Sequence, residues 1–87
     1  MKHASDPDIV KRLKRAEGHL RALIDMIEAK RPCLELAQQL HAIERAIGNA
    51  KRELIHDHME HCLDDGVLNG TSARAALREF RALAKYL

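Results

Sequence analysis

Apolar side chains recur every three or four residues along most of the chain, which is the period of an amphipathic α-helix. A first helix is expected to begin at Asp6-Pro7, where an acid stands at the N-cap and proline at the first helical position. It should end near Lys30, because Pro32 disfavours a helical backbone at the residue before it. The apolar face of this helix comprises Ile9, Leu13, Ala16, Leu20, Ile24 and Ile27.

Two further helices are expected after Pro32. The second meets no helix breaker except Gly48 before Gly66, and the third follows the turn Asn69–Ser72. The apolar stripe of the second helix has the spacing of a coiled-coil seam and consists of Leu36, Leu40, Ile43, Ile47, Ala50 and Leu54. The third helix carries Leu77, Phe80, Leu83 or Ala84, and Leu87. The pattern therefore predicts an all-α fold of three helices.

The composition also favours helices over a sheet, because alanine and leucine dominate and aromatic residues are only 2% of the chain. A chain of 87 residues predicts one domain, residues 1–87, with a flexible N-terminus at residues 1–6. So small a core is usually completed by oligomerisation. No apolar run reaches the ~20 residues of a membrane helix, and the N-terminus lacks the apolar core of a signal peptide. We therefore expect a cytoplasmic protein with no membrane partner.

A candidate metal site lies toward the end of the second helix. His58 and Cys62 stand four positions apart, so their side chains lie on one face of the helix. A thiolate and an imidazole suit Cu(I), Zn(II), Ni(II) or Co(II) rather than magnesium or calcium. Such a pair alone is more often part of a core or a surface than a metal site. Cys33 strengthens the metal hypothesis, because it lies on the same stripe 25 residues before His58.

The separation of these candidate ligands predicts a dimer. On one continuous helix Cys33 and His58 are ~37 Å apart and cannot bind the same ion. Two copies of the helix packed antiparallel would bring Cys33 of one chain beside His58 and Cys62 of the other. The apolar stripe between them is the surface that this pairing buries. We therefore expect a homodimer with two equivalent sites, one at each end of the interface.

The other histidines carry weaker predictions. His3 and His61 are possible additional ligands, whereas His41 and His56 are expected to be exposed on the helix surface. The chain has no CxxC or HExxH motif and no glycine-rich phosphate loop, so we expect neither an enzyme nor an organic cofactor.

Charge is distributed unevenly along the chain. Residues 1–31 carry eight basic and five acidic side chains, whereas residues 32–87 carry seven basic and eight acidic ones. Much of the basic excess lies in the cluster Lys11-Arg12-Leu13-Lys14-Arg15. This cluster is either a solvated helix face or a surface for an anionic partner.

Four segments together have the arrangement of a known family. They are RLKRAEGHL at residues 12–20, Pro32-Cys33, Leu40–Ile43 and HDHMEHC at residues 56–62. In these segments the chain resembles the CsoR/RcnR family of bacterial metal-sensing repressors. The resemblance implies an antiparallel dimer that forms a four-helix bundle, and usually a dimer of dimers, making a homotetramer. It also implies a repressor that binds operator DNA without metal and leaves it on binding an inducer, which releases genes for metal efflux or detoxification.

The resemblance implies roles for individual residues. Cys33 of the partner chain, His58 and Cys62 match the Cys-His-Cys ligands of the family's copper sensors, and Glu79 matches an acid beside those ligands. A tyrosine next to the ligands of those sensors is replaced here by Pro32. The implied DNA contacts are Arg12, Lys14, Arg15, Lys51 and Arg52, the last two substituting for a family basic position that is Asn49 here.

The resemblance leaves several inducers open. Cu(I) matches the three ligands, while Ni(II) is implied by the NreA-type nickel subgroup that the ligand segments also resemble, with His3 available as a further ligand. Co(II) and Zn(II) are alternatives. A formaldehyde-sensing branch has an acid in place of Cys62, and a persulfide-sensing branch uses the two cysteines without His58. Outside the family, the alternative is a metal-buffering helical bundle with no DNA role.

Overall fold

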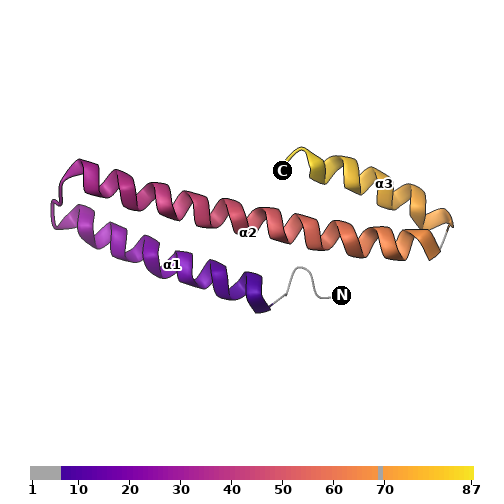
Figure 1. Cartoon of the computed structure of the whole chain (residues 1–87), viewed down its shortest axis with the longest axis horizontal. Coiled ribbons are helices and arrows are strands. Elements are labelled where there is room, and N and C mark those ends of the chain that lie inside the picture. The colour runs from indigo at the N-terminus through magenta and orange to yellow at the C-terminus, as the bar shows by residue number, and fades with distance from the viewer. Residues whose placement is uncertain (1–6, 69) are drawn as a thin grey trace. The chain divides into compact units, whose positions relative to one another are not determined.

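The computed structural model describes the backbone of residues 7–68 and 70–87 and the side chains of residues 7–60 and 73–87. Three helices make up most of it: α1 (Pro7–Glu28), α2 (Cys33–Leu68) and α3 (Gly70–Ala84) (Figure 1). These described residues contain no strand, which confirms the predicted all-α fold. Within the same residues, no helix is both long and apolar enough to cross a membrane. The N-terminus that was expected to be flexible, residues 1–6, lies outside the described part of the chain.

The turn after α1 is a hydrogen-bonded helix cap. The Lys30 amide donates to the Ile27 carbonyl (3.0 Å) and the Arg31 amide donates to the Met26 carbonyl (3.1 Å). Lys30 has a φ of 59°, the left-handed conformation that this cap requires. Glycine usually occupies this position, because any side chain there costs about 1–2 kcal/mol. The helix thus ends at Glu28, slightly before the expected end near Lys30.

The other helix boundaries differ from the prediction by a few residues. Pro32 precedes α2, and its carbonyl accepts the hydrogen bond of the amide four residues on (3.1 Å). At its far end α2 passes Gly66 and stops at Leu68, and α3 begins at Gly70 instead of after Ser72. The predicted turn is therefore shorter. The first amides of a helix have no intrahelical acceptor, so polar side chains that can accept from them are common in its first turn.

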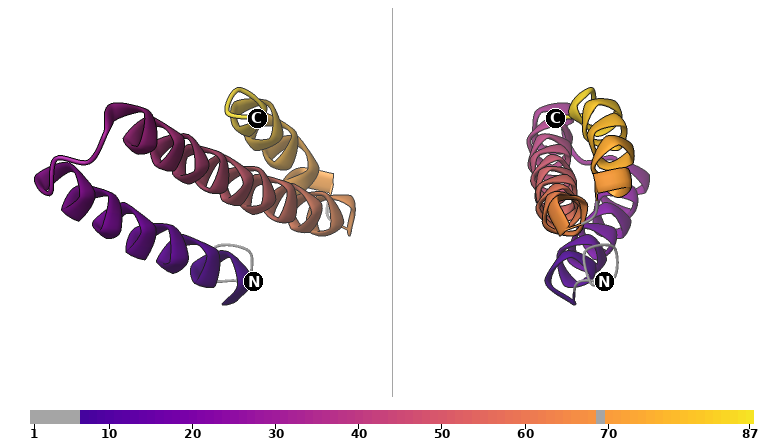
Figure 2. Two further views of the ribbon diagram at one scale, coloured as in Figure 1. Left: turned by 60° about the vertical axis from the view of Figure 1, so that its left-hand side comes forward. Right: turned by 90° about the vertical axis from the view of Figure 1, so that its right-hand side faces the viewer.

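The chain divides into two compact units, of which the first is residues 7–50. Here α1 runs antiparallel to the first half of α2 (Figures 1 and 2). The core of this unit consists of Ile9, Ala16 and Leu23 from α1 and Ile43 and Ala50 from α2, all buried. The core residues of α1 recur every seven positions, as expected where one helix lies along another.

One side of this unit leaves large apolar side chains exposed. We call it the apolar edge, and its members are Leu13, Leu20, Ile24 and Ile27 of α1 and Leu40 and Ile47 of α2. They belong to the predicted stripes, yet they are between 41% and 53% exposed. The apolar face of each helix is therefore wider than the other helix of the unit can cover.

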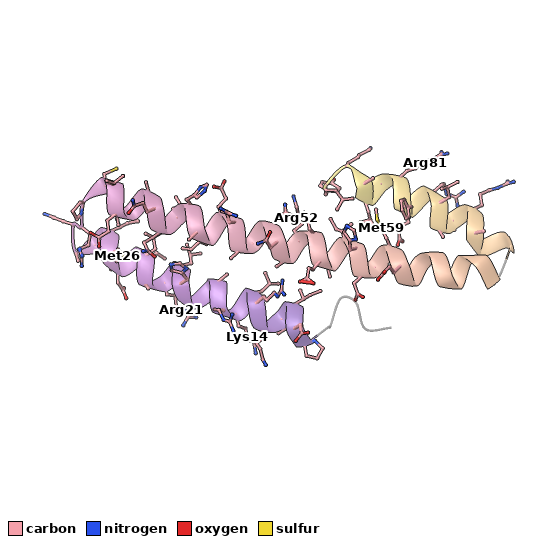
Figure 3. All side chains as sticks on the ribbon, in the orientation of Figure 1. Lys14, Arg21, Met26, Arg52, Met59 and Arg81 are labelled. Carbon is pink, nitrogen blue, oxygen red and sulfur yellow. The ribbon has the colours of Figure 1, made fainter. Side chains whose placement is uncertain are left out.

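The second unit includes residues 51–87. Here α3 returns along the second half of α2 (Figures 1 and 2). Ile55 and Met59 of α2 are buried, while Leu54 of α2 and Phe80 and Leu83 of α3 are half-buried. Met59 projects from α2 on the side of α3 (Figure 3). This packing places α3 next to His58, the central residue of the predicted metal site.

Candidate metal centre and basic surface

The imidazole of His58 contacts a carboxylate from α3. Its Nε2–H donates a hydrogen bond to Oε1 of Glu79. The two residues are 21 positions apart in the chain, so only the packing of α3 against α2 brings them together. With the proton on Nε2, Nδ1 is the ring nitrogen that could act as a metal ligand. A carboxylate that accepts from a histidine in this way orients the ring and makes its other nitrogen a stronger ligand.

His58 also borders an apolar hollow. A hollow of about 220 Å³ is lined by His58 together with Leu54, Ile55 and Leu83. Apolar walls restrict the access of water to a metal ligand and so favour coordination over hydration. An imidazole in such surroundings is a ligand type that suits a soft or borderline metal ion.

The other predicted ligands lie elsewhere or outside the described side chains. Cys33 is the first residue of α2, and its thiol is exposed and not in a disulfide. Cys62 belongs to the helical backbone of α2, but its side chain and that of His61 are not among those described, and His3 is not described at all. Within the part of the chain that is described, no three His, Cys, Asp or Glu residues are placed to hold one metal ion. The contribution of Cys33 from a partner chain remains a prediction.

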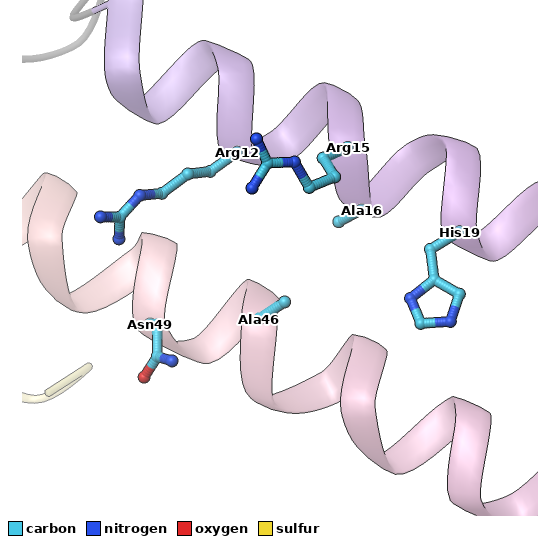
Figure 4. A pocket seen from close by; sticks show the side chains of 6 residues that line it. All are labelled: Arg12, Arg15, Ala16, His19, Ala46 and Asn49. Atoms are coloured by element: carbon cyan, nitrogen blue, oxygen red, sulfur yellow. The ribbon is translucent and has the colours of Figure 1, made fainter.

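The basic residues of α1 do not form one continuous patch. Arg12 and Arg15 line a hollow of about 310 Å³ between α1 and α2 (Figure 4). Lys14, by contrast, projects from the side of α1 away from α2, as does Arg21 (Figure 3). We call the first feature the basic hollow, and its described lining is Arg12, Arg15, Ala16, His19, Ala46 and Asn49.

Two of these lining residues had no predicted binding role. His19 stands four positions after Arg15, and this spacing already places it on the same face of the helix. Asn49 occupies the position where the family pattern has a basic residue, and the structure places it in the same hollow as Arg12. The spacing along α1 could have identified His19, whereas the approach of Asn49 depends on how α2 packs.

Lys51 and Arg52 lie in the second unit, where both are exposed. Arg52 lines a shallow groove along α2 together with Glu53, His56, Asp57 and Glu60. Its charge is thus surrounded by carboxylates, which weakens its attraction for a phosphate backbone. The predicted exposure of His56 and His41 is confirmed.

A family model described as metal-sensitive transcriptional repressor matches residues 5–86. The chain belongs to the CsoR/RcnR family of metal-sensitive repressors. Members of this family are transcriptional repressors and not enzymes, in agreement with the sequence analysis.

Named members of the CsoR/RcnR family are similar along most of the chain. The copper-sensing transcriptional repressor CsoR of Bacillus subtilis is 36% identical over 67 residues, which are 77% of this chain and 66% of that protein. CsoR of Mycobacterium ulcerans is 36% identical over 75 residues, 86% of this chain and 63% of that protein. The chain thus spans slightly less than two thirds of the length of these relatives.

A solved structure of the family has the same fold. The nickel-responsive transcriptional regulator InrS superposes with a TM-score of 0.82 at 31% identity, covering 95% of this chain and 93% of that one. The predicted resemblance to this family is therefore confirmed by both sequence and structure.

Proposed function

We propose that this protein is a transcriptional repressor that binds operator DNA without metal and releases it on binding Cu(I) or Ni(II). Release would derepress genes for metal efflux or detoxification, and the protein would act in the cytoplasm. The observation that carries the proposal is the contact between His58 and Glu79, in which a carboxylate orients the imidazole of a candidate metal ligand. The copper-sensing and nickel-responsive relatives support both metals as inducers.

The proposed site combines His58 and Cys62 of one chain with Cys33 of its partner. Two thiolates and one imidazole suit Cu(I), whereas His3 or His61 could supply the fourth donor that Ni(II) prefers. Co(II) and Zn(II) are compatible with the same donors. On one continuous helix, Cys33 and His58 of a single chain would be ~37 Å apart. Each site would therefore draw on two chains.

The apolar edge supports the proposed homodimer. Six large aliphatic side chains at heptad-like spacing remain exposed along α1 and the first half of α2. Two such surfaces packed on each other form a four-helix bundle, which would cover side chains that a single chain leaves in water. A dimer of dimers is the assembly that we propose for DNA binding.

The proposed DNA surface is built around Arg12 and Arg15 of the basic hollow, with Lys14, Lys51 and Arg52 as further contacts. Guanidinium groups bind phosphate oxygens through paired hydrogen bonds and need no base contact to do so. Both arginines are exposed and lie on one face of α1.

The function is tested by measuring binding to the DNA upstream of the protein's own gene with and without metal. Fluorescence anisotropy should show that Cu(I) or Ni(II) weakens DNA binding, by the factor that corresponds to a coupling of about 1–3 kcal/mol or more. By reciprocity, DNA should lower the affinity for that metal by the same factor. Metal binding that is equal with and without DNA would contradict the sensor function. Metal binding with no DNA binding at all would indicate a metal buffer.

Absorption spectroscopy distinguishes the two main inducers. Ni(II) in a four-coordinate thiolate site gives d–d bands as well as charge-transfer bands, whereas d¹⁰ Cu(I) gives no d–d bands. The metal that both binds tightly and releases DNA is the inducer.

A further inference from the structure

Four basic side chains form one row along the outer face of α3 and the turn that directly follows it. Arg74, Arg78, Arg81 and Lys85 stand four, three and four residues apart. On a helix of 3.6 residues per turn, this spacing directs all four within about 60° of one another. We call them the basic row. All four are exposed, and Arg81 projects from the side of α3 away from α2 (Figure 3).

The opposite face of α3 packs on α2. Glu79 accepts a hydrogen bond from His58, and Leu83 lines the apolar hollow beside that histidine. Both residues lie about 130–170° around the helix from the middle of the basic row. Glu79 is also the only acidic residue in the sequence of α3. The basic row is therefore turned away from α2 and from the one carboxylate of its own helix.

No acid along the helix neutralises the basic row. On α1, by contrast, Arg21 forms an ion pair with Glu17, four residues before it (3.6 Å). In the basic row, every residue three or four positions away is either another cation of the row or uncharged. Among the residues that the structure describes, none of the four cations pairs with a carboxylate. Because like charges at this spacing repel one another, the row destabilises α3 in the absence of an anionic partner.

The surroundings of the basic row favour a polyanion over a protein or a membrane as its partner. A protein interface needs an apolar centre, and only Leu77 supplies a large apolar side chain next to the row. A membrane surface would bind the apolar face of α3, but Phe80 and Leu83 of that face are half-buried on α2. The other positions that flank the row have short side chains and are Ala73, Ala75, Ala82 and Ala84.

We propose that the basic row is a second DNA-contact surface, which binds the phosphate backbone in addition to the contacts proposed above for α1 and α2. Three of its four cations are arginines, whose guanidinium groups bind phosphate oxygens through paired hydrogen bonds. The row is ~16 Å long, which matches the rise of about five phosphates along one DNA strand at about 3.4 Å each. The flanking alanines leave room for that strand to approach the helix.

This inference rests on the proposed repressor function, because it requires that the protein binds DNA. Contacts to phosphates carry no sequence information, so the basic row would add affinity and salt dependence without changing which operator is recognised.

The test compares the full-length wild-type chain with Arg74→Ala/Arg78→Ala, without metal. Fluorescence anisotropy measures the affinity for the DNA upstream of the protein's own gene over a range of salt concentrations. Both positions are exposed and alanine favours a helix, so the variant should fold, which circular dichroism verifies. At about 100 mM salt it should bind DNA about ten-fold more weakly or less tightly still, and the slope of log affinity against log salt concentration should fall by about one for each arginine removed.

The matched control is Arg21→Ala/Arg45→Ala. It removes the same charge from exposed positions of α1 and α2 that have no proposed DNA contact, so its slope should stay close to that of the wild-type protein. Light scattering without DNA measures the oligomeric state of each variant. This control is needed because the shallow groove of α2, with its three carboxylates, is another anionic surface that a second copy of the chain would offer.

A larger loss of affinity and slope in Arg74→Ala/Arg78→Ala than in the control, with the oligomeric state unchanged, would support the inference. Equal losses in the two variants would indicate general attraction to positive charge and overturn it, as would wild-type affinity and slope in the row variant. Dissociation of the wild-type assembly by Arg74→Ala/Arg78→Ala would make a second copy the partner of the row and also overturn it. In these cases the repressor function stands if the wild-type protein binds DNA, whereas a wild-type protein that binds no DNA would contradict both.

Discussion

Replacing Glu79 tests whether the contact with His58 prepares a metal ligand. Glu79→Gln keeps the shape of the side chain and an oxygen that can accept from Nε2–H, but it removes the negative charge. A metal bound at Nδ1 would draw electron density from the imidazole, and the carboxylate of Glu79 would stabilise the resulting positive charge on the ring. The variant should therefore fold normally and bind metal more weakly.

The structure sets the size of the expected loss. Removing the partner of a metal-ligating histidine typically weakens metal binding by about 10–100-fold. Here the side chains of His58 and Glu79 are 32% and 47% exposed, so water screens part of their interaction. We therefore expect a loss near the lower limit, about ten-fold, which corresponds to about 1.4 kcal/mol.

The measurement is a competition for Cu(I) or Ni(II) against a chelator of known affinity, without oxygen. Glu60→Gln is the matched control, because it removes the same charge from an exposed position of α2 two residues from His58. Circular dichroism before the titration confirms that each variant is folded. Equal metal affinities for the wild-type protein and Glu79→Gln would refute the role assigned to Glu79. Equal losses in the two variants would reduce that role to general electrostatics.

Three further predictions concern the assembly, the DNA surface and the helix cap. Cys33→Ala and the double variant His58→Ala/Cys62→Ala should each lose metal binding, whereas heterodimers of the two variants should regain at most half a metal site per chain. Mass spectrometry verifies that the heterodimers form, and heterodimers that bind no metal would contradict the two-chain site. Arg12→Ala should weaken DNA binding and reduce the slope of log affinity against log salt concentration by roughly one for each phosphate that the protein no longer neutralises. An unchanged slope would show that Arg12 does not contact the DNA. Lys30→Gly should raise the free energy of unfolding by about 0.5–1 kcal/mol, because glycine adopts the left-handed φ without strain; thermal denaturation measures this, and a lower melting temperature would contradict it.

The periodicity of the sequence determined the number of helices and their apolar faces, because both depend on residues within a few turns of each other. Pro32 likewise marked the connection between the first two helices, since its effect on the backbone is local. The spacing of His58 and Cys62 placed both on one helix face for the same reason. The family was also predictable, because its motifs are short segments with fixed residue types.

Only the packing of the helices decided which apolar residues became core. Leu23 is buried although it was absent from the predicted stripe, while Leu20 and Ile27, which belong to that stripe, lie in the exposed apolar edge. An apolar face that spans about 100° or more offers several directions in which a neighbouring helix can pack, and periodicity does not distinguish them. The left-handed Lys30 also followed from the path of the chain between helices, against the preference of its own side chain.

The candidate sites show the same division between local and tertiary information. The residue types of both sites were visible in the sequence. Their contacts were not, because one site joins α2 to α3 and the other joins α2 to α1. Glu79 reaches His58 because α3 returns along α2, and Asn49 shares a hollow with Arg12 because α1 lies along the first half of α2. Such contacts depend on the angle and register of two packed helices, which the side chains of both helices determine together.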